Sequence, residues 1–209
     1  MRPRGGAEYA REKKGLERAK GGRERSRWRT GDVRRFSQKP IDRALLVDWV
    51  DCARLSPSAS NRQPLRYRII DDPARVERVF PLTRWAALLG PQGTPAPGER
   101  PTAFILLLVD RAVAPGGCAH DAGAAAQTIQ LLATGHGVGC CWMGAIDREA
   151  ILAAEGLDPE RYALDTLLAL GYAGEAAVFE DAPDGDVRYY RDETGRHRVR
   201  KRTLDDVLI

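Results

Sequence analysis

The chain has 209 residues, of which 43% are hydrophobic and 30% charged, and its formal net charge is +4. These values are typical of one globular domain and exclude a fibrous or wholly disordered chain. The longest apolar run, residues 103–109, is too short for a transmembrane helix, and no charged-then-apolar secretory leader is present. We therefore expect a cytoplasmic protein with no membrane partner.

Positive charge is concentrated at the start of the sequence. Residues 1–30 contain eleven Lys and Arg against four Glu, a net of +7, which leaves −3 for residues 31–209. Residues 1–30 have no apolar periodicity, so we predict a flexible basic leader ahead of one folded domain, residues 31–209. A nucleic-acid-binding arm and a solubilising extension both fit this composition. No aromatic stacking platform accompanies the charge, which favours the second and makes nucleic acid an unexpected partner.

Apolar periodicity and turn residues divide the remaining sequence into short elements. The pattern predicts helices over residues 43–54, 73–80, 119–134 and 147–155, and strands over residues 66–70, 103–109, 138–142 and 166–170. Residues 90–98 are rich in Gly and Pro and are predicted to form a loop, and residues 181–209 read as a polar tail. Helices that alternate with short buried strands indicate a sheet flanked by helices, in an α/β or α+β fold.

Cysteines and histidines give little sign of a metal site. The cysteines are Cys52, Cys118, Cys140 and Cys141, and no CxxC pair occurs among them. A cluster that includes Cys118 and His120 is conceivable, but the missing zinc spacing favours structural thiols and no metal. We expect His120 and His136 to be packing or helix-end residues.

Two further features leave alternatives open. Trp85 either covers a ligand or belongs to the core. The sequence of residues 122–126, AGAAA, has almost no side chains and permits close approach of either a flat ligand or another helix.

Residues 55–64, LSPSASNRQP, raise the main functional question. They combine three hydroxyls, two carboxamides and a guanidinium with two prolines that prevent a regular helix or strand. A proline-rich turn that ends a helix explains this composition, and so does a loop that converges on a ligand. The flanking motifs favour the second interpretation.

The order of motifs along the chain resembles the nitroreductase family of flavin enzymes. The helix over residues 43–54 is followed by SPSASNRQP and the strand RYRII, which is similar to the family signature Ser/Ala-Pro-Ser-x-x-Asn-x-Gln-Pro. DAGAAAQ, GVGCCWMG and LLALGYAGE follow in the family order. RYYRDETGRHRVRKRTLDDVL is similar to the C-terminal arm of one subgroup, so the resemblance covers residues 33–209.

This resemblance implies the fold, the assembly and the cofactor. The expected fold is α+β, with three α/β/α layers, a central and mostly antiparallel sheet, and a domain-swapped C-terminal arm, residues 181–209. The expected assembly is a homodimer that binds FMN at each end of its interface. The implied partners are NAD(P)H and a small flat electron acceptor such as a nitroaromatic or a quinone, reduced in ping-pong fashion through the flavin. No GxGxxG fingerprint is present, as expected if the nicotinamide stacks on the flavin.

The resemblance also assigns cofactor-binding positions, and no catalytic side chain, because the flavin carries the chemistry. The implied cofactor-binding residues are Arg34, Arg35, Pro57, Ser58, Ser60, Asn61, Gln63, Trp142, Met143, Gly144, Lys201 and Arg202. Lys and Arg suit the phosphate, and hydroxyls and carboxamides suit the ribityl chain and the pyrimidine edge. Main-chain groups of residues 142–144 are expected near flavin N5.

The sequence departs from the family before its first core helix. Thr30, Gly31 and Asp32 stand where the phosphate motif usually has Arg, Arg or His, and Ser. Arg27 or Arg29 could substitute from a shifted register. A second hypothesis therefore remains open, a catalytically decayed binding protein whose basic leader contacts nucleic acid or an acidic partner.

Overall fold

The central feature of the structure, a computed structural model, is a four-stranded antiparallel sheet in the order β1-β2-β4-β3. The model describes residues 31–209, and the predictions for residues 1–30 lie outside this range. The strands are β1 (Leu65–Ile70), β2 (Ala103–Asp110), β3 (Val138–Met143) and β4 (Tyr162–Tyr172). All eight residues of β2 are buried, which confirms the prediction from its unbroken apolar run.

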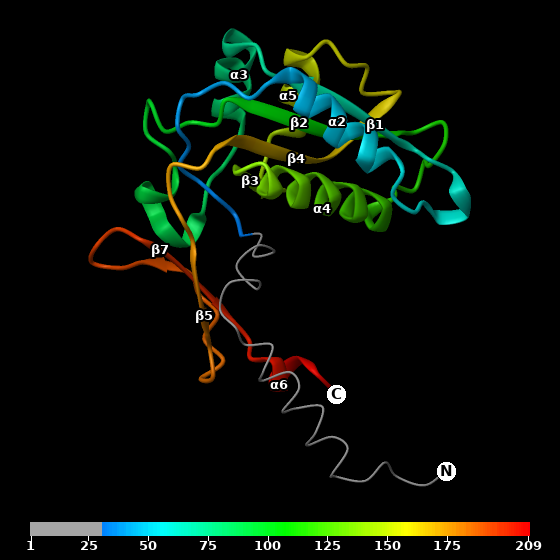
Figure 1. Ribbon diagram of the computed structural model, residues 1–209. Helices are drawn as coiled ribbons and strands as arrows, with labels where there is room; N and C mark the ends of the chain where they lie inside the picture. Colours follow the sequence, from blue (N-terminus) through cyan, green and yellow to red (C-terminus); the bar gives the residue numbers. More distant parts are fainter. Residues whose placement is uncertain (1–30) are drawn as a thin grey trace, which may run out of the picture. The chain divides into compact units, whose positions relative to one another are not determined.

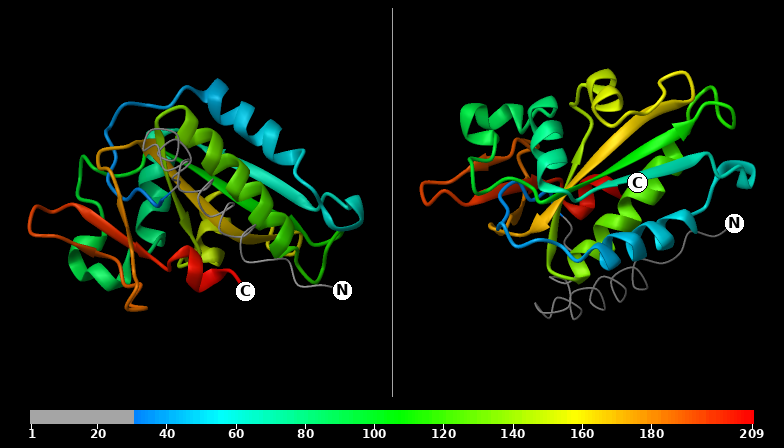
Figure 2. Two further views of the ribbon diagram at one scale, coloured as in Figure 1. Left: turned by 60° about the horizontal axis from the view of Figure 1, so that its bottom comes forward. Right: turned by 90° about the horizontal axis from the view of Figure 1, so that it is seen from above.

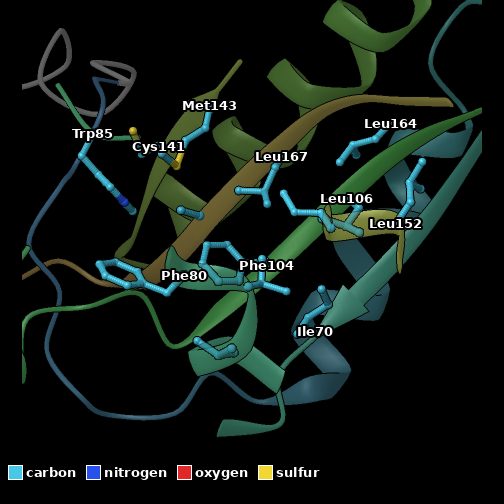
Figure 3. Packing of buried hydrophobic residues seen from close by; sticks show 14 of the residues in the cluster. Ile70, Phe80, Trp85, Phe104, Leu106, Cys141, Met143, Leu152, Leu164 and Leu167 are labelled. Atoms are coloured by element: carbon cyan, nitrogen blue, oxygen red, sulfur yellow. The ribbon is translucent and has the colours of Figure 1, made fainter. Parts of the chain in front are cut away.

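Helices cover both faces of this sheet (Figure 1). They are α2 (Arg43–Arg54), α3 (Pro73–Val79), α4 (Ala119–Gly135) and α5 (Arg148–Ala154). Side chains of α2 and α4 pack with Ile105 and Leu107 of β2, while those of α3 and α5 pack with Leu106 and Leu108. Because successive strand residues point to opposite faces, β2 contributes to two cores. Figure 3 shows the core on the α3–α5 side. The predicted α+β fold with three layers is confirmed.

Polar caps start three of the helices where the sequence predicted their beginnings. The Asp42 carboxylate accepts from the Ala44 N–H at the start of α2, and the Asp147 carboxylate accepts from the Ala150 N–H at the start of α5. Asp72 caps α3 in the same way, with Pro73 at its first position. Each carboxylate satisfies a backbone donor that has no partner inside the helix.

Strand β4 is longer than the predicted strand over residues 166–170. Leu107 of β2 pairs with Thr166, and Leu108 pairs with Leu164, so Asp165 is an extra residue in the ladder. The bulge residue Asp165 and the next residue, Thr166, are polar. They interrupt the apolar pattern, so the sequence did not predict the first part of this strand. Residues 90–98 were predicted as loop throughout, but the 3₁₀ segment η4 (Ala87–Gly93) includes their beginning.

The C-terminal residues form a second sheet, in place of the polar tail that the sequence indicated. Its strands are β5 (Val178–Asp181), β6 (Tyr190–Arg191) and β7 (His197–Lys201), in the order β5-β7-β6, followed by α6 (Leu204–Val207). Ion pairs link its strands and turns, including Arg198 with Glu180 and Arg200 with Asp184. These strands are short and charged, so apolar periodicity could not reveal them. They lie apart from the four-stranded sheet (Figures 1 and 2).

Membrane-spanning helices and metal-binding clusters can both be assessed within residues 31–209. No helix in this range has the length and apolar character needed to cross a membrane. In the same range, no group of three or more His, Cys, Asp or Glu side chains is arranged to hold a metal ion. Cys140 and Cys141 are buried in β3, in agreement with a structural role, and burial raises the pKa of both thiols.

Candidate functional site

The loop of residues 55–64 has a backbone conformation that is costly for its residue types. Ser60, Asn61 and Gln63 have φ values of 52°, 52° and 51°, in the left-handed region that non-glycine residues seldom adopt. A 3₁₀ turn, η2 (Ala59–Asn61), contains two of them. Such strain persists only when the surrounding structure imposes it, and it is concentrated at functional sites. The conformation therefore favours the ligand-loop interpretation over a simple turn.

Asp121 of α4 holds this loop in place. Its carboxylate accepts from the Ser58 hydroxyl at 2.7 Å and from the Ala59 N–H at 3.3 Å. The Ser58 hydroxyl oxygen in turn accepts from the Gln63 N–H at 2.9 Å. Asp121 is only 7% exposed, and its bonds are of the strong charge-assisted kind. The loop and the first turn of α4 are thus one hydrogen-bonded unit.

Sequence reasoning did not identify Asp121 as a site residue, although DAGAAAQ contains it. An acidic residue in the first turn of a helix is ordinarily explained by the helix dipole. Only the folded chain shows that this carboxylate binds a loop about sixty residues away in sequence. The Ser58 hydroxyl bonds to Asp121 and to the Gln63 N–H, and its predicted role in cofactor binding stays a prediction.

The carboxamides of the loop remain at the surface. Asn61 and Gln63 are exposed, and their side chains bond to each other, Gln63 Nε2 donating to Asn61 Oδ1 at 3.1 Å. The loop contributes to two adjacent cavities of about 410 and 340 Å³. The first also contacts Cys118 and Asp165, and the second contacts Tyr67. Polar groups are therefore presented beside open volume.

The thiol of Cys118 and the phenol of Tyr67, beside these cavities, both have raised pKa values. Burial, assisted by Asp121, raises the pKa of the Cys118 thiol to about 11. Burial, with a smaller effect of Cys118, raises the pKa of Tyr67 to about 12. Burial also raises the pKa of Asp165, while Arg148 opposes that rise. Neither the thiol nor the phenol is an activated nucleophile.

The second predicted segment, residues 142–144, lies at the end of β3. The Trp142 side chain is 38% exposed, whereas Met143 is buried and its carbonyl accepts from the Thr166 hydroxyl at 2.9 Å. Apart from Gly144 itself and its two chain neighbours, no atom of residues 31–209 lies within 4 Å of the position that a Cβ on Gly144 would occupy. The Trp142 N–H donates to Asp32 Oδ1 at 3.3 Å. An exposed indole and an open glycine thus end a strand whose backbone is anchored.

The small-residue half of α4 serves helix packing and also borders Trp142. Ala122, Ala125 and Ala126 are fully buried, and the latter two pack in the core with α2, which supports the packing alternative for the AGAAA sequence. At Gly123, an added Cβ would lie 3.7 Å from the Trp142 ring. Trp85, the other open alternative, is 6% exposed and packs against Phe36 and Phe80 in the core.

The predicted phosphate-binding cations have different surroundings. Arg34 is buried and bonds to His197 and Asp32, and Arg35 forms an ion pair with Glu99 at 3.5 Å. Lys201 and Arg202 are exposed at the end of β7, and within residues 31–209 neither has a carboxylate at ion-pair distance. Lys201 and Arg202 are therefore the available cations, while Arg34 is engaged inside the protein.

The loop and the end of β3 adjoin different faces of α4. The loop is bonded to Asp121, and Trp142 lies next to Gly123. Residues two positions apart on a helix do not share a face. One chain therefore does not bring the two predicted segments onto the same face of this helix.

The fold and these segments define a nitroreductase-type protein, and the comparison with known families agrees. The sequence profile of the Nitroreductase family matches residues 27–172. The chain belongs to the nitroreductase family.

Individual relatives are distant. The chain is 26% identical over 172 residues to the 5,6-dimethylbenzimidazole synthase of Rhodospirillum rubrum, a match that covers 71% of this chain and 80% of the relative. A solved structure from Desulfovibrio desulfuricans, in complex with FMN, is 23% identical, with a TM-score of 0.62 and coverage of 88% and 92% of the two chains. A nitroreductase family protein from Clostridium difficile 630 is 16% identical, with a TM-score of 0.59 and coverage of 88% and 94%. At these identities the solved structures establish the fold alone.

Proposed function

We propose that this protein is a cytoplasmic FMN-dependent oxidoreductase that uses NAD(P)H to reduce a small flat electrophile, such as a nitroaromatic or a quinone. Family membership supports the class of enzyme. The observation that carries the proposal is the loop of residues 55–64, which contains three left-handed residues, is anchored by Asp121 through Ser58 and Ala59, and contributes to two cavities. A strained, anchored loop that presents exposed carboxamides supports a ligand-binding role.

The residues present fit the chemical parts of FMN. Exposed hydroxyl and carboxamide groups of Ser60, Asn61 and Gln63 can pair with ribityl hydroxyls or the pyrimidine edge. Lys201 and Arg202 can neutralise the phosphate, because charge-assisted bonds to phosphate are strong. Residues 142–144 offer an exposed indole and an open glycine for a flat ring. When bound, FMN supplies the hydride-transfer chemistry, and the protein supplies orientation and electrostatics.

A homodimer accounts for the separation of the two segments on α4. In a homodimer, each site can combine the loop of residues 55–64 from one protomer with residues 142–144 from the other. The two segments then need not lie on the same face of one α4 helix. The end of the chain also suits an interface, since Leu204, Val207 and Leu208 are 58%, 56% and 63% exposed. Apolar side chains grouped in this way mark interaction surfaces. The swapped arm, residues 181–209, belongs to this proposal.

An absorbance spectrum of the purified protein tests the function directly. We expect flavin absorbance after purification or after addition of FMN, and bleaching of that absorbance during anaerobic titration with NADH or NADPH. Reoxidation on adding a nitroaromatic or a quinone would complete the cycle. A colourless protein that neither takes up FMN nor oxidises NAD(P)H would contradict the enzyme and favour the binding-protein alternative.

The curated relative supports a second candidate, synthesis of 5,6-dimethylbenzimidazole. This relative covers most of the folded range, although its identity to this chain is 26%. The test is incubation of the flavin-loaded protein with NAD(P)H in air, followed by mass spectrometry for 5,6-dimethylbenzimidazole. Formation of this product would favour the synthase, and turnover of nitroaromatics without it would favour the reductase.

A further inference from the structure

A buried polar cluster joins the C-terminal sheet to the start of the described chain. We define this arm cluster as Arg34, Glu175, Arg191 and His197. Arg191 of β6 and His197 of β7 are directly paired in the antiparallel ladder, so their side chains share a face. Arg191 donates to Glu175 at 2.7 Å, and Glu175 accepts from the Arg34 N–H at 2.9 Å. The cluster therefore connects three separate parts of the chain.

His197 is the most buried member of the arm cluster, with no exposed surface. Its Nε2 lies 3.1 Å from Arg34 Nη1. Because a guanidinium only donates, Nε2 is the acceptor, and the ring proton of the neutral tautomer is on Nδ1. The edge of the Tyr189 ring contacts the His197 ring, and the Arg34 guanidinium lies over Tyr189. This geometry requires an unprotonated Nε2.

Arg34 also connects His197 to the end of β3 through hydrogen bonds. Its Nη2 donates to Asp32 Oδ2 at 3.2 Å, and the other oxygen of Asp32 accepts from the Trp142 N–H at 3.3 Å. A continuous chain of hydrogen bonds therefore runs from His197 through Arg34 and Asp32 to the Trp142 backbone. Asp32 is one of the three residues that depart from the family phosphate motif, and here its carboxylate bonds to Arg34 and Trp142.

The charges that face His197 oppose its protonation. Arg34 and Arg191 repel a charged imidazole, and Glu175 attracts one. Burial is the largest effect and Arg34 the next, and together they lower the pKa of His197 to about 4. A proton on Nε2 would remove the acceptor of Arg34 and place two cations about 3 Å apart.

We propose that His197 is a positioning residue for the candidate flavin site: its neutral ring fixes Arg34, which through Asp32 fixes the Trp142 backbone, and its protonation in acid uncouples the C-terminal sheet from the end of β3. The coupling itself rests on the hydrogen bonds alone. Its effect on FMN rests on the proposed function, because β7 also carries Lys201, four residues after His197. Protonation of His197 would therefore disturb both residues 142–144, proposed to contact the flavin ring, and the proposed phosphate ligands Lys201 and Arg202.

The first experiment measures the Trp142 amide in the full chain without flavin. Hydrogen exchange of the ¹⁵N-labelled amide is compared in wild type, His197→Gln and His197→Phe. Gln keeps an acceptor for Arg34, whereas Phe keeps a ring without one. We expect Trp142 exchange to rise about tenfold in His197→Phe and less than about twofold in His197→Gln, as loss of one buried acceptor implies. His120→Phe, at an exposed position, is the control.

Unchanged Trp142 exchange in a folded His197→Phe protein would overturn the coupling. If this variant fails to fold, Asp32→Asn serves instead, because it keeps an acceptor for Trp142 and loses the charge that holds Arg34. We then expect the Cε1–H resonance of His197 to shift at pH 7 and the resonances of His120 and His136 to stay in place. An unshifted His197 resonance would contradict the proposed chain.

The second experiment measures the dissociation constant of FMN from pH 7 to pH 4 by flavin fluorescence. We expect it to rise about twofold more in wild type than in His197→Gln by pH 4, because about half of the His197 side chains are then protonated and Gln does not titrate. Identical profiles would overturn the link to the cofactor. Failure of wild type to bind FMN at pH 7 would instead overturn the proposed function, and the Trp142 measurement would still decide the coupling.

Discussion

In the four-stranded sheet every residue of β2 is buried, whereas the C-terminal sheet consists of short strands whose charged side chains form ion pairs across turns. Burial of apolar surface stabilises the first, at roughly 25 cal/mol per Å². The second depends on hydrogen bonds and charges, which salt and protons weaken. The difference predicts that stability resides in the main sheet and that sensitivity to conditions resides in the C-terminal residues.

The largest effect should come from the main sheet. Phe104 of β2 has no exposed surface and lies in the core on the α3–α5 side (Figure 3). Phe104→Ala should lower the free energy of unfolding by about 3–5 kcal/mol, because it removes buried contacts and leaves a cavity. Urea unfolding monitored by circular dichroism measures this loss. Val47→Ala, at a position of α2 that is 48% exposed, is the control, and an equal loss there would contradict the comparison.

The second-largest effect should come from loss of Asp121, which anchors the loop of residues 55–64. Asp121→Ala removes the acceptor of both Ser58 and Ala59, and it should cost about 2–3 kcal/mol and loosen the loop. We expect faster proteolysis within residues 55–64 and weaker FMN binding by about tenfold. Asp48→Ala is the matched control, because Asp48 is exposed on α2 and its carboxylate forms no hydrogen bond or ion pair within residues 31–209. If residues 55–64 of Asp121→Ala resist proteolysis as well as in wild type, Asp121 is not what holds the left-handed backbone of this loop.

An acid titration sharpens the comparison at His197. Its folded pKa is about 4 and the unfolded value is about 6.5, so the unfolded chain takes up a proton that the folded chain excludes. The contribution to stability is complete above pH 6.5 and is lost as the pH falls toward 4. We expect wild type to lose on the order of 2 kcal/mol more than His197→Gln across this window in urea unfolding. Parallel curves would mean that the histidine is not excluded from protonation.

The smallest effect should come from the exposed ion pairs. Arg200 contacts Glu180, Asp184 and Asp186, all in or near the turn after β5. Because exposed ion pairs contribute little, Arg200→Gln should speed amide exchange in β7 by about twofold at low salt and by less in 0.5 M NaCl. Mass spectrometry of exchanged peptides measures this change. A large loss of global stability would indicate that this sheet contributes more than its charges suggest.

Sequence reasoning located the core elements because their signals are local. The apolar run of β2, the periodicity of α2, and the caps Asp42 and Asp147 were all recognisable without the fold. The roles of Asp121 and His197 were not recognisable, because each depends on partners more than sixty residues away. Arg34 shows the limit most clearly, since its predicted role as a phosphate ligand stays a prediction while its guanidinium contacts the C-terminal sheet.

By itself, the sequence determined that helices flank a sheet and that residues 55–64 are polar, because hydrophobic period and turn residues act over a few positions. The α+β class was implied by the family resemblance. Only the tertiary structure decided which polar groups are free and which are engaged. Asn61, Lys201 and Arg202 remain exposed, whereas Ser58 and Arg34 are held by distant partners. The physical reason is that a hydrogen bond or a pKa depends on the atoms that the fold brings within a few ångströms.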